Sequence, residues 1–151
     1  MWYRVFCRSA DEVPPAAILG KLRDEALPVE GRFRRDDLGW TAGELAIGKG
    51  APVYLERYLA TADSIRDDLN TWAAWLETLD YSPNNTSLME LVIQTQQLVI
   101  IRKPLDHSNE VEVDRVCRAV CLFIAASADG VFQVEDDGWY AADGGLILKE
   151  Y

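Results

Sequence analysis

The sequence predicts an α+β fold made of two tandem β-α-β-β(-β) units, at about 1–60 and 98–151, related by pseudo-twofold duplication and joined by a helical connector at 61–97. The stretch GRFRRDDLGWTA at 31–42 returns as GVFQVEDDGWYA at 130–141, with six identities in twelve positions at an offset of 99 residues. At the same offset, apolar positions of two predicted helices coincide, Ile18 with Cys117 and Leu22 with Cys121. Two unrelated hairpins are the alternative, because Asp, Gly and aromatic residues are frequent in hairpins.

Length and composition predict a single domain over residues 1–151. The chain has 151 residues, of which 49% are hydrophobic and 26% charged, as is typical of a soluble globular protein. Its longest apolar runs are too short to span a membrane, and the N-terminus lacks the apolar segment of a signal peptide. We therefore expect a cytoplasmic protein that does not bind a membrane.

The first unit begins with a strand and a helix. WYRVFCR at 2–8 alternates apolar and basic residues with period two, which predicts a strand with one buried face. A helix follows, with Pro14 and Pro15 in its first turn and Pro28 at its end. Its apolar stripe is Ile18, Leu19, Leu22 and Ala26. Strand-like runs at 29–35, 38–47 and 53–60 complete the unit.

The second unit repeats this order. A β-branched run at 98–103 precedes a helix that is predicted to start near Ser108 and Asn109 and to end at Asp129-Gly130. Strands at 131–135, 139–142 and 146–151 follow. In both units the glycine before the tryptophan, Gly39 or Gly138, is expected to supply the positive φ of a tight turn.

The connector is predicted to be helical. Asp63 or Ser64 can cap a helix, with Asp67 completing a capping box, and an apolar face follows. That face consists of Ile65, Leu69, Trp72, Leu76 and Leu79. Trp75 lies beside Trp72, and the two could form a recognition patch, although core packing is favoured. A Ser-Pro-Asn-Asn sequence at 82–85 breaks the helix. The segment 88–97 fits either a helix or a strand, and a helix is favoured.

Paired modules of this kind resemble the vicinal oxygen chelate fold of glyoxalase-like metalloenzymes, and the tail ADGGLILKEY at 142–151 is similar to the Asp-x-Gly stretch before the last strand of that fold. The resemblance implies His, Glu or Gln metal ligands on facing strands. The last predicted strand carries Leu146, Ile147 and Leu148 instead, so we expect no metal. Tandem ferredoxin-like halves, or one sheet flanked by helices, fit the same order of elements.

Charge limits the class of partner. The net charge is −10, and residues 76–151 carry 5 basic and 13 acidic side chains, a net charge of −8. Nucleic acid is therefore not expected as a partner, because its binders usually present a basic stripe. A basic protein is the expected partner, although simple solubility explains the charge equally well.

Catalytic and cofactor motifs are scarce. The only histidine, His107, lies in a polar loop, and the sequence contains no glycine-rich phosphate-binding motif. Cys7, Cys117 and Cys121 lack the spacing of a zinc site and are interpreted as buried apolar residues. Carboxylates at 135–137 with Asp143 could hold a hard cation, but they are interpreted as turn residues. No cofactor is expected.

Two groups of residues are candidates for binding. The aromatic group could line a shared concave surface, although core packing explains it as well. Its members are Trp40, Tyr54, Tyr58, Trp139 and Tyr140. Arg32 and Arg34, with Arg35, could contact an anion or a partner, or else guard a sheet edge against aggregation.

These observations favour a non-catalytic cytosolic interaction protein that binds a basic protein partner. An immunity protein that neutralises a bacterial toxin is one protein of this type. The alternative is a small-molecule binding module that uses the groove between the two units. An enzyme is the third hypothesis; whether the chain is one stays open, with the sequence leaning against it. The oligomeric state and the biological process are not encoded in any motif.

Overall fold

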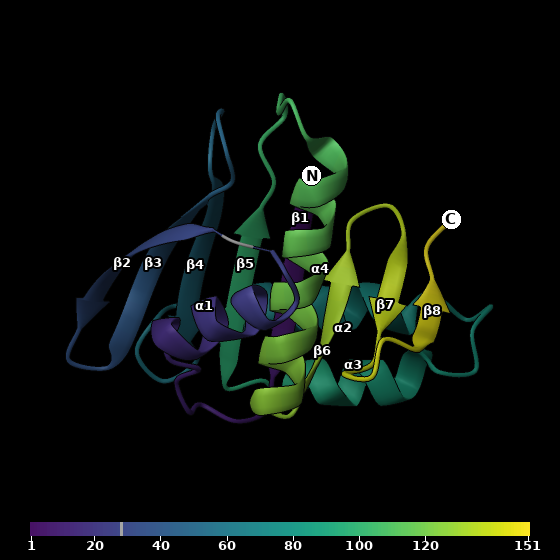
Figure 1. Cartoon of the computed structure of the whole chain (residues 1–151). Coiled ribbons are helices and arrows are strands. Elements are labelled where there is room, and N and C mark those ends of the chain that lie inside the picture. The colour runs from purple at the N-terminus through teal and green to yellow at the C-terminus, as the bar shows by residue number, and fades with distance from the viewer. Residues whose placement is uncertain (28) are drawn as a thin grey trace.

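The computed structural model describes residues 1–27 and 29–151, and in these residues eight strands form one antiparallel sheet that four helices cover (Figure 1). The strands are β1 (Trp2–Cys7), β2 (Glu30–Asp36), β3 (Gly39–Ala46), β4 (Val53–Leu59), β5 (Gln97–Arg102), β6 (Gly130–Val134), β7 (Gly138–Tyr140) and β8 (Leu146–Lys149). The helices are α1 (Pro15–Asp24), α2 (Arg66–Glu77), α3 (Asn85–Ile93) and α4 (Glu110–Ser127). The order across the sheet is β2-β3-β4-β5-β1-β6-β7-β8. The predicted α+β class is confirmed.

The two faces of the sheet carry separate cores. On one face α1 and α4 pack over the sheet, with Ile18 and Val120 among the buried residues. On the other face α2 and α3 bury Leu69 and Val92. Because β1 lies at the centre with helices on both faces, Phe6 is buried as well as Val5, and the prediction of one buried face for this strand is wrong.

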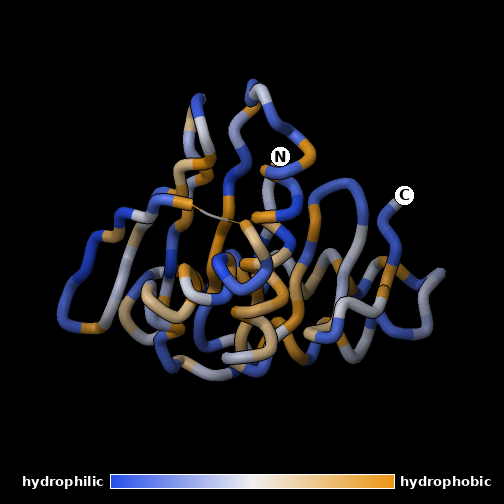
Figure 2. The backbone as a smooth tube through the Cα atoms, viewed as in Figure 1, coloured by the Kyte–Doolittle hydropathy of each residue, from blue (hydrophilic) through white to orange (hydrophobic). Residues whose placement is uncertain are grey.

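The helices α2 and α3 cover only half of their face. The strand residues of their core come from β1, β5, β6, β7 and β8, and β4 contributes only the half-buried Tyr58. The outward side of β2, β3 and β4 on this face is uncovered, and we call it the open face. Figure 1 shows β2 and β3 extending beyond the helices, and Figure 2 shows hydrophilic residues along β2. The fold thus leaves the β2–β4 half of one sheet face without a covering helix.

The strand order does not confirm the predicted duplication. If the two units were equivalent, β4 and β8 would take matching places, but β4 pairs with β5 near the centre and β8 forms an outer edge. Neither the ferredoxin-like nor the vicinal-oxygen-chelate-like topology is confirmed, since one sheet holds all strands of the described residues. Sequence similarity between two hairpins does not fix where each hairpin joins a sheet.

The two matching tryptophans lie on opposite faces of the sheet. Trp40 is buried in the core under α1 and α4, whereas Trp139 is buried in the core under α2 and α3. A rotation that keeps α1 and α4 on their common face therefore cannot superimpose the two side chains. Equivalent positions in the repeated motif have been packed into different cores.

The two hairpin turns also differ. Gly39 has a φ of 113°, as predicted, but in the second hairpin Asp136 takes the positive φ, 59°, and the prediction for Gly138 is wrong. Gly138 is needed for a different reason, because an added Cβ would lie 2.6 Å from the carbonyl oxygen of Leu148. Glycine is required at position 138 because β7 and β8 approach each other closely there.

Helix ends follow the predictions in part. Asn109 caps α4 by accepting from the backbone N–H of Glu112, as expected. The predicted capping box at Ser64 is wrong, since α2 begins after Ile65 without a side-chain cap and Asp63 accepts from the N–H of Leu59. The ambiguous segment is helical up to Ile93 and β5 begins at Gln97. The helix end predicted at Pro28 lies outside the described residues.

Candidate functional site

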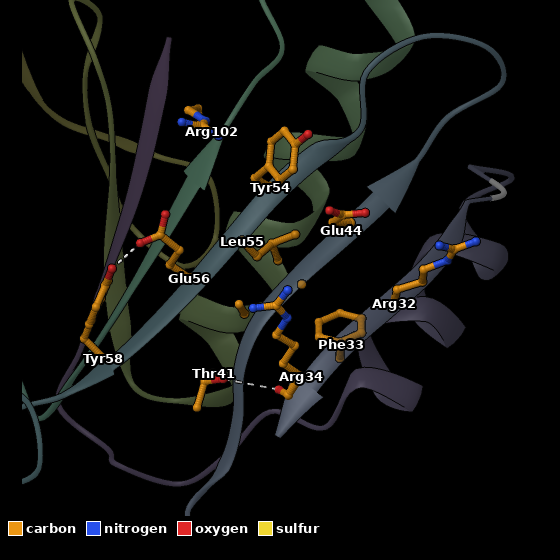
Figure 3. A pocket seen from close by; sticks show the side chains of 12 residues that line it. Arg32, Phe33, Arg34, Thr41, Glu44, Tyr54, Leu55, Glu56, Tyr58 and Arg102 are labelled. Atoms are coloured by element: carbon orange, nitrogen blue, oxygen red, sulfur yellow. Dashed lines mark hydrogen bonds between the residues drawn. The ribbon is translucent and has the colours of Figure 1, made fainter. Parts of the chain in front are cut away.

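A cavity of about 610 Å³ lies on the open face. Four of the predicted binding residues line it, namely Arg32, Arg34, Tyr54 and Tyr58 (Figure 3). Glu44, Glu56, Thr41, Ala42, Gly43, Phe33, Leu55 and Arg102 complete the lining. We call it the arginine cavity. The structure therefore brings together residues from β2, β4 and β5 that the sequence holds far apart.

Strand register explains why these side chains meet. In an antiparallel sheet, residues that pair across strands project to the same face. One cross-strand row runs Arg32, Glu44, Tyr54, Arg102 over four neighbouring strands. The next row runs Arg34, Ala42, Glu56. Burial alternates along β4. Its buried residues lie toward the core on one face of the sheet, and Tyr54 and Glu56 of the two rows line the cavity on the other face.

The cavity holds more positive than negative groups. In the described residues Arg32, Arg34 and Arg102 form no ion pair, although Arg32 lies directly opposite Glu44 in the ladder. The Glu56 carboxylate accepts a hydrogen bond from the Tyr58 hydroxyl, and this bond, with burial, raises the pKa of Tyr58 to about 12. Three guanidinium groups thus face two carboxylates, one of which already has a partner.

A row of alternating aromatic and arginine side chains leads away from this cavity. The guanidinium carbon of Arg102 lies 4.8 Å from the ring centroid of Tyr54 and 5.7 Å from that of Trp2. Arg4 continues the row, at 6.0 Å from Trp2 and 4.8 Å from Trp72. Such contacts hold guanidinium planes against ring faces and contribute about 0.5–1 kcal/mol each at exposed sites.

The row ends at a second cavity of about 380 Å³ between α2 and the β6–β7 turn. Its lining consists of Arg4, Thr71, Trp72, Trp75, Gln133, Glu135, Asp136 and Glu150. We call it the tryptophan cavity. It combines indole faces with three carboxylates, so its chemistry is opposite in sign to that of the arginine cavity.

Hydrogen bonds fix the floor of the tryptophan cavity. Arg4 donates to Oε1 of Gln133 at 2.9 Å, and Nε2 of Gln133 donates to Oε1 of Glu150 at 2.6 Å. Burial lowers the pKa of Arg4 and raises the pKa of Glu150. Glu135 is tied to β1, because its carboxylate accepts from the N–H of Trp2. The charged groups are therefore positioned before any partner arrives.

Three predicted residues lie elsewhere. Trp40 is buried and donates through Nε1 to the carbonyl oxygen of Val13. Trp139 is buried against Phe6, with its Nε1 unpaired. Tyr140 lies beside α4, with Arg118 over its ring, and its hydroxyl donates to Asp137 in the β6–β7 turn. Because these three residues lie in or beside the two cores, they do not share a concave surface with Tyr54 and Tyr58.

The histidine is half-buried in a loop, and the cysteines are buried. Nδ1 of His107 accepts from the N–H of Asn109, so Nε2 carries the proton and donates to the carbonyl oxygen of Ile47. The three cysteine thiols are free and buried, and burial raises the pKa of each. Such thiols are weak nucleophiles at neutral pH. In the described part of the chain no three His, Cys, Asp or Glu side chains gather in a way that could hold a metal ion.

Neither Arg102 nor Trp2 was among the predicted binding residues, and for Trp72 core packing was favoured over a recognition patch. The period-two pattern of VYLERYL signalled one exposed face on β4, but nothing local showed that Arg102 would pair opposite Tyr54. That juxtaposition depends on β5 joining β4 from another part of the chain. Pairing between distant strands is the information that sequence periodicity lacks.

Comparison with family models, with curated proteins and with solved structures finds no match. Within the described residues no helix combines the length and the apolar character needed to cross a membrane. The two cavities and the row between them are therefore the basis for any functional proposal.

Proposed function

We propose that this chain is a non-catalytic interaction protein that binds a basic protein partner through the tryptophan cavity. The observation that carries the proposal is the meeting of an exposed indole with carboxylates: Trp75, with 37% of its surface exposed, shares the cavity with Glu135, Asp136 and Glu150. Indole faces attract cations, and carboxylates accept charge-assisted hydrogen bonds from Lys and Arg. The combination suits a basic side chain of a partner.

Arg4 already makes the kind of contact that a basic side chain of a partner would make in this cavity. Its guanidinium group lies over Trp72 and is attracted by Glu135 and Glu150. One arginine against three carboxylates leaves the cavity lining with a net charge of −2, counted from its lining residues. A Lys or Arg from a partner would compensate the remaining charge.

The surroundings support a protein interface. Tyr81 and Tyr151, which are 51% and 96% exposed, contact each other with ring centroids 5.5 Å apart next to Glu150. Exposed aromatic residues often anchor interfaces, and the charge of −8 on residues 76–151 would steer a basic partner toward them. An immunity protein that neutralises a toxin is one type of protein with these properties.

The proposed place of this interaction is the cytoplasm. The free, buried state of all three cysteines supports it, because disulfides are rare in that compartment.

Affinity capture from the producing cells, followed by calorimetry with the purified partner, tests the proposal. We expect one basic protein in stoichiometric amount, bound more weakly as salt rises from 50 to about 500 mM, because screening shortens the range of the charges. Trp75→Ala should weaken binding about 30-fold or more, the effect typical of an aromatic anchor. Asp136→Asn should weaken it less and reduce the salt dependence.

Asp24→Asn, an exposed carboxylate next to the end of α1 on the opposite face, is the matched control and should leave the affinity unchanged. The proposal fails if no basic partner is captured, or if Trp75→Ala and Asp136→Asn bind the captured protein as the unaltered chain does.

A further inference from the structure

We infer that the arginine cavity is a binding site for a small organic anion that carries a carboxylate or phosphate group. The inference does not depend on the basic partner proposed above, because the residues that carry it, from β2 to β5, do not line the tryptophan cavity. Its volume of about 610 Å³ lies within the range of about 300–1,000 Å³ that is typical of small-molecule sites. The class of ligand follows from the charges of the lining.

The arginines of the cavity lack partners of their own. Arg32, Arg34 and Arg102 make neither an ion pair nor a side-chain hydrogen bond within the described residues, whereas Arg4, Arg8, Arg57 and Arg118 each make at least one. A guanidinium group has five N–H donors and binds carboxylate or phosphate in a bidentate manner. An anion would satisfy donors that the protein leaves open.

Arg34 and Arg102 line the cavity from different strands, β2 and β5. The guanidinium carbon of Arg102 lies 4.8 Å from the ring centroid of Tyr54, and its N–H donors make no hydrogen bond within the described residues. Figure 3 shows the Arg34 side chain reaching from β2 over β3 toward Leu55 and Glu56. The two residues stand on β2 and β5, in neighbouring cross-strand rows, and three strand spacings separate them by about 14 Å across the strands.

The size of Ala42 gives the cavity its depth. Ala42 lies between Arg34 and Glu56 in the cross-strand row, where a larger side chain would fill the space. It is half-buried, and the core on the opposite face does not include it. A longer residue at this position would therefore block the cavity while leaving every charge in place.

Charge also limits the ligand to a small anion. The lining carries three arginines and two glutamates, a net charge of +1, on a chain of net charge −10. A polyanion such as RNA would meet repulsion from the rest of the surface, because such ligands require a basic stripe. Glu44, which makes no ion pair in the described residues, could accept a hydrogen bond from a hydroxyl or amino group of the ligand.

Titration with inorganic phosphate, succinate and benzoate, monitored by NMR of backbone amides and arginine Nε–H groups, tests the inference. Succinamide serves as the uncharged control. We expect saturable shifts at Arg34, Arg102 and the amides of β3 and β4 with at least one anion. A response to phosphate alone would assign a phosphate ligand, and a response to succinate or benzoate a carboxylate ligand.

Variants separate a specific site from general attraction. Arg34→Gln, Arg102→Gln and Ala42→Leu should each weaken the anion by at least tenfold, while Arg23→Gln, an exposed arginine on α1, should have no effect. Urea unfolding establishes that each variant is folded. The inference is wrong if none of the three anions gives saturable shifts at the cavity, or if Arg23→Gln and Ala42→Leu affect binding equally.

Discussion

Arg57 donates through Nε to Oε1 of Gln97, and together the two buried side chains hold the β1–α1 loop against the sheet. Arg57 also donates to the carbonyl oxygens of Leu38, Trp40 and Ala10. Nε2 of Gln97 donates to the carbonyl oxygens of the same loop, at residues 9 and 11. Because Arg57 lies between two residues that line the arginine cavity, this network fixes the strand on which the cavity depends.

Arg57→Ala should therefore destabilise the fold strongly. Removal of the guanidinium group leaves two buried acceptors, the carbonyl oxygen of Trp40 and Oε1 of Gln97, without this donor, and each buried group that stays unpaired costs about 1–3 kcal/mol. We expect the free energy of unfolding to fall by about 3 kcal/mol or more in urea denaturation. Arg23→Ala on the exposed side of α1 should change it by less than about 0.5 kcal/mol. A loss below about 1 kcal/mol for Arg57→Ala would contradict the importance of this network.

The two buried tryptophans should respond differently to replacement by phenylalanine. Trp40→Phe removes the hydrogen bond to the carbonyl oxygen of Val13, whereas Trp139→Phe removes an N–H that has no partner. Both changes reduce the volume of a core side chain by the same amount. The difference between their losses in free energy of unfolding therefore measures the hydrogen bond of Trp40, and a buried acceptor left unpaired costs about 1–3 kcal/mol. We expect Trp40→Phe to lower the free energy of unfolding more. Equal losses would show that the Nε1 contact of Trp40 contributes little.

Two glycines should give opposite results when replaced by alanine. Gly20 lies within α1, and an added Cβ would meet only the end of the Arg23 side chain at 3.8 Å. Gly20→Ala should raise the free energy of unfolding by about 0.5–1 kcal/mol through helix propensity. Gly138→Ala should lower it, since the new Cβ would clash with the carbonyl oxygen of Leu148. Thermal unfolding of both variants checks the pair, and a stable Gly138→Ala would show that β8 can move away.

The titration of Tyr58 should report its hydrogen bond to Glu56. The bond raises the pKa of Tyr58 from the ordinary 10.0 to about 12. Between these values the folded chain keeps a proton that the unfolded chain has lost, so the free energy of unfolding should fall as pH rises through this window. Glu56→Gln should move the pKa back toward 10.

The measurement is the phenolate absorbance near 295 nm, with Tyr58→Phe subtracted to isolate one of the six tyrosines. A Tyr58 pKa that does not change in Glu56→Gln would show that burial alone holds the proton.

Local patterns in the sequence predicted most of the elements. Period-two and helical spacing located the strands and three of the four helices of the described residues, and the start of α4 near Asn109 was predicted. For α3 a helix was favoured over a strand without a decisive pattern. Four residues of the arginine cavity, Arg32, Arg34, Tyr54 and Tyr58, were also singled out, because a charged cluster on a strand and alternating aromatics are visible without a fold. What these patterns could not show was which residues would become neighbours.

The repeated glycine-tryptophan motif shows that a local pattern does not determine tertiary neighbours. It predicted two equivalent hairpins, yet Trp40 and Trp139 entered cores on opposite faces, and only the tertiary structure decided this. A hairpin depends on residues close in sequence, whereas its place in the sheet depends on pairing with distant strands and on which helices compete for each face. For the same reason the sequence determined the chemistry of Arg34, Tyr54 and Arg102, and the pairing of β4 with β5 brought them to one cavity.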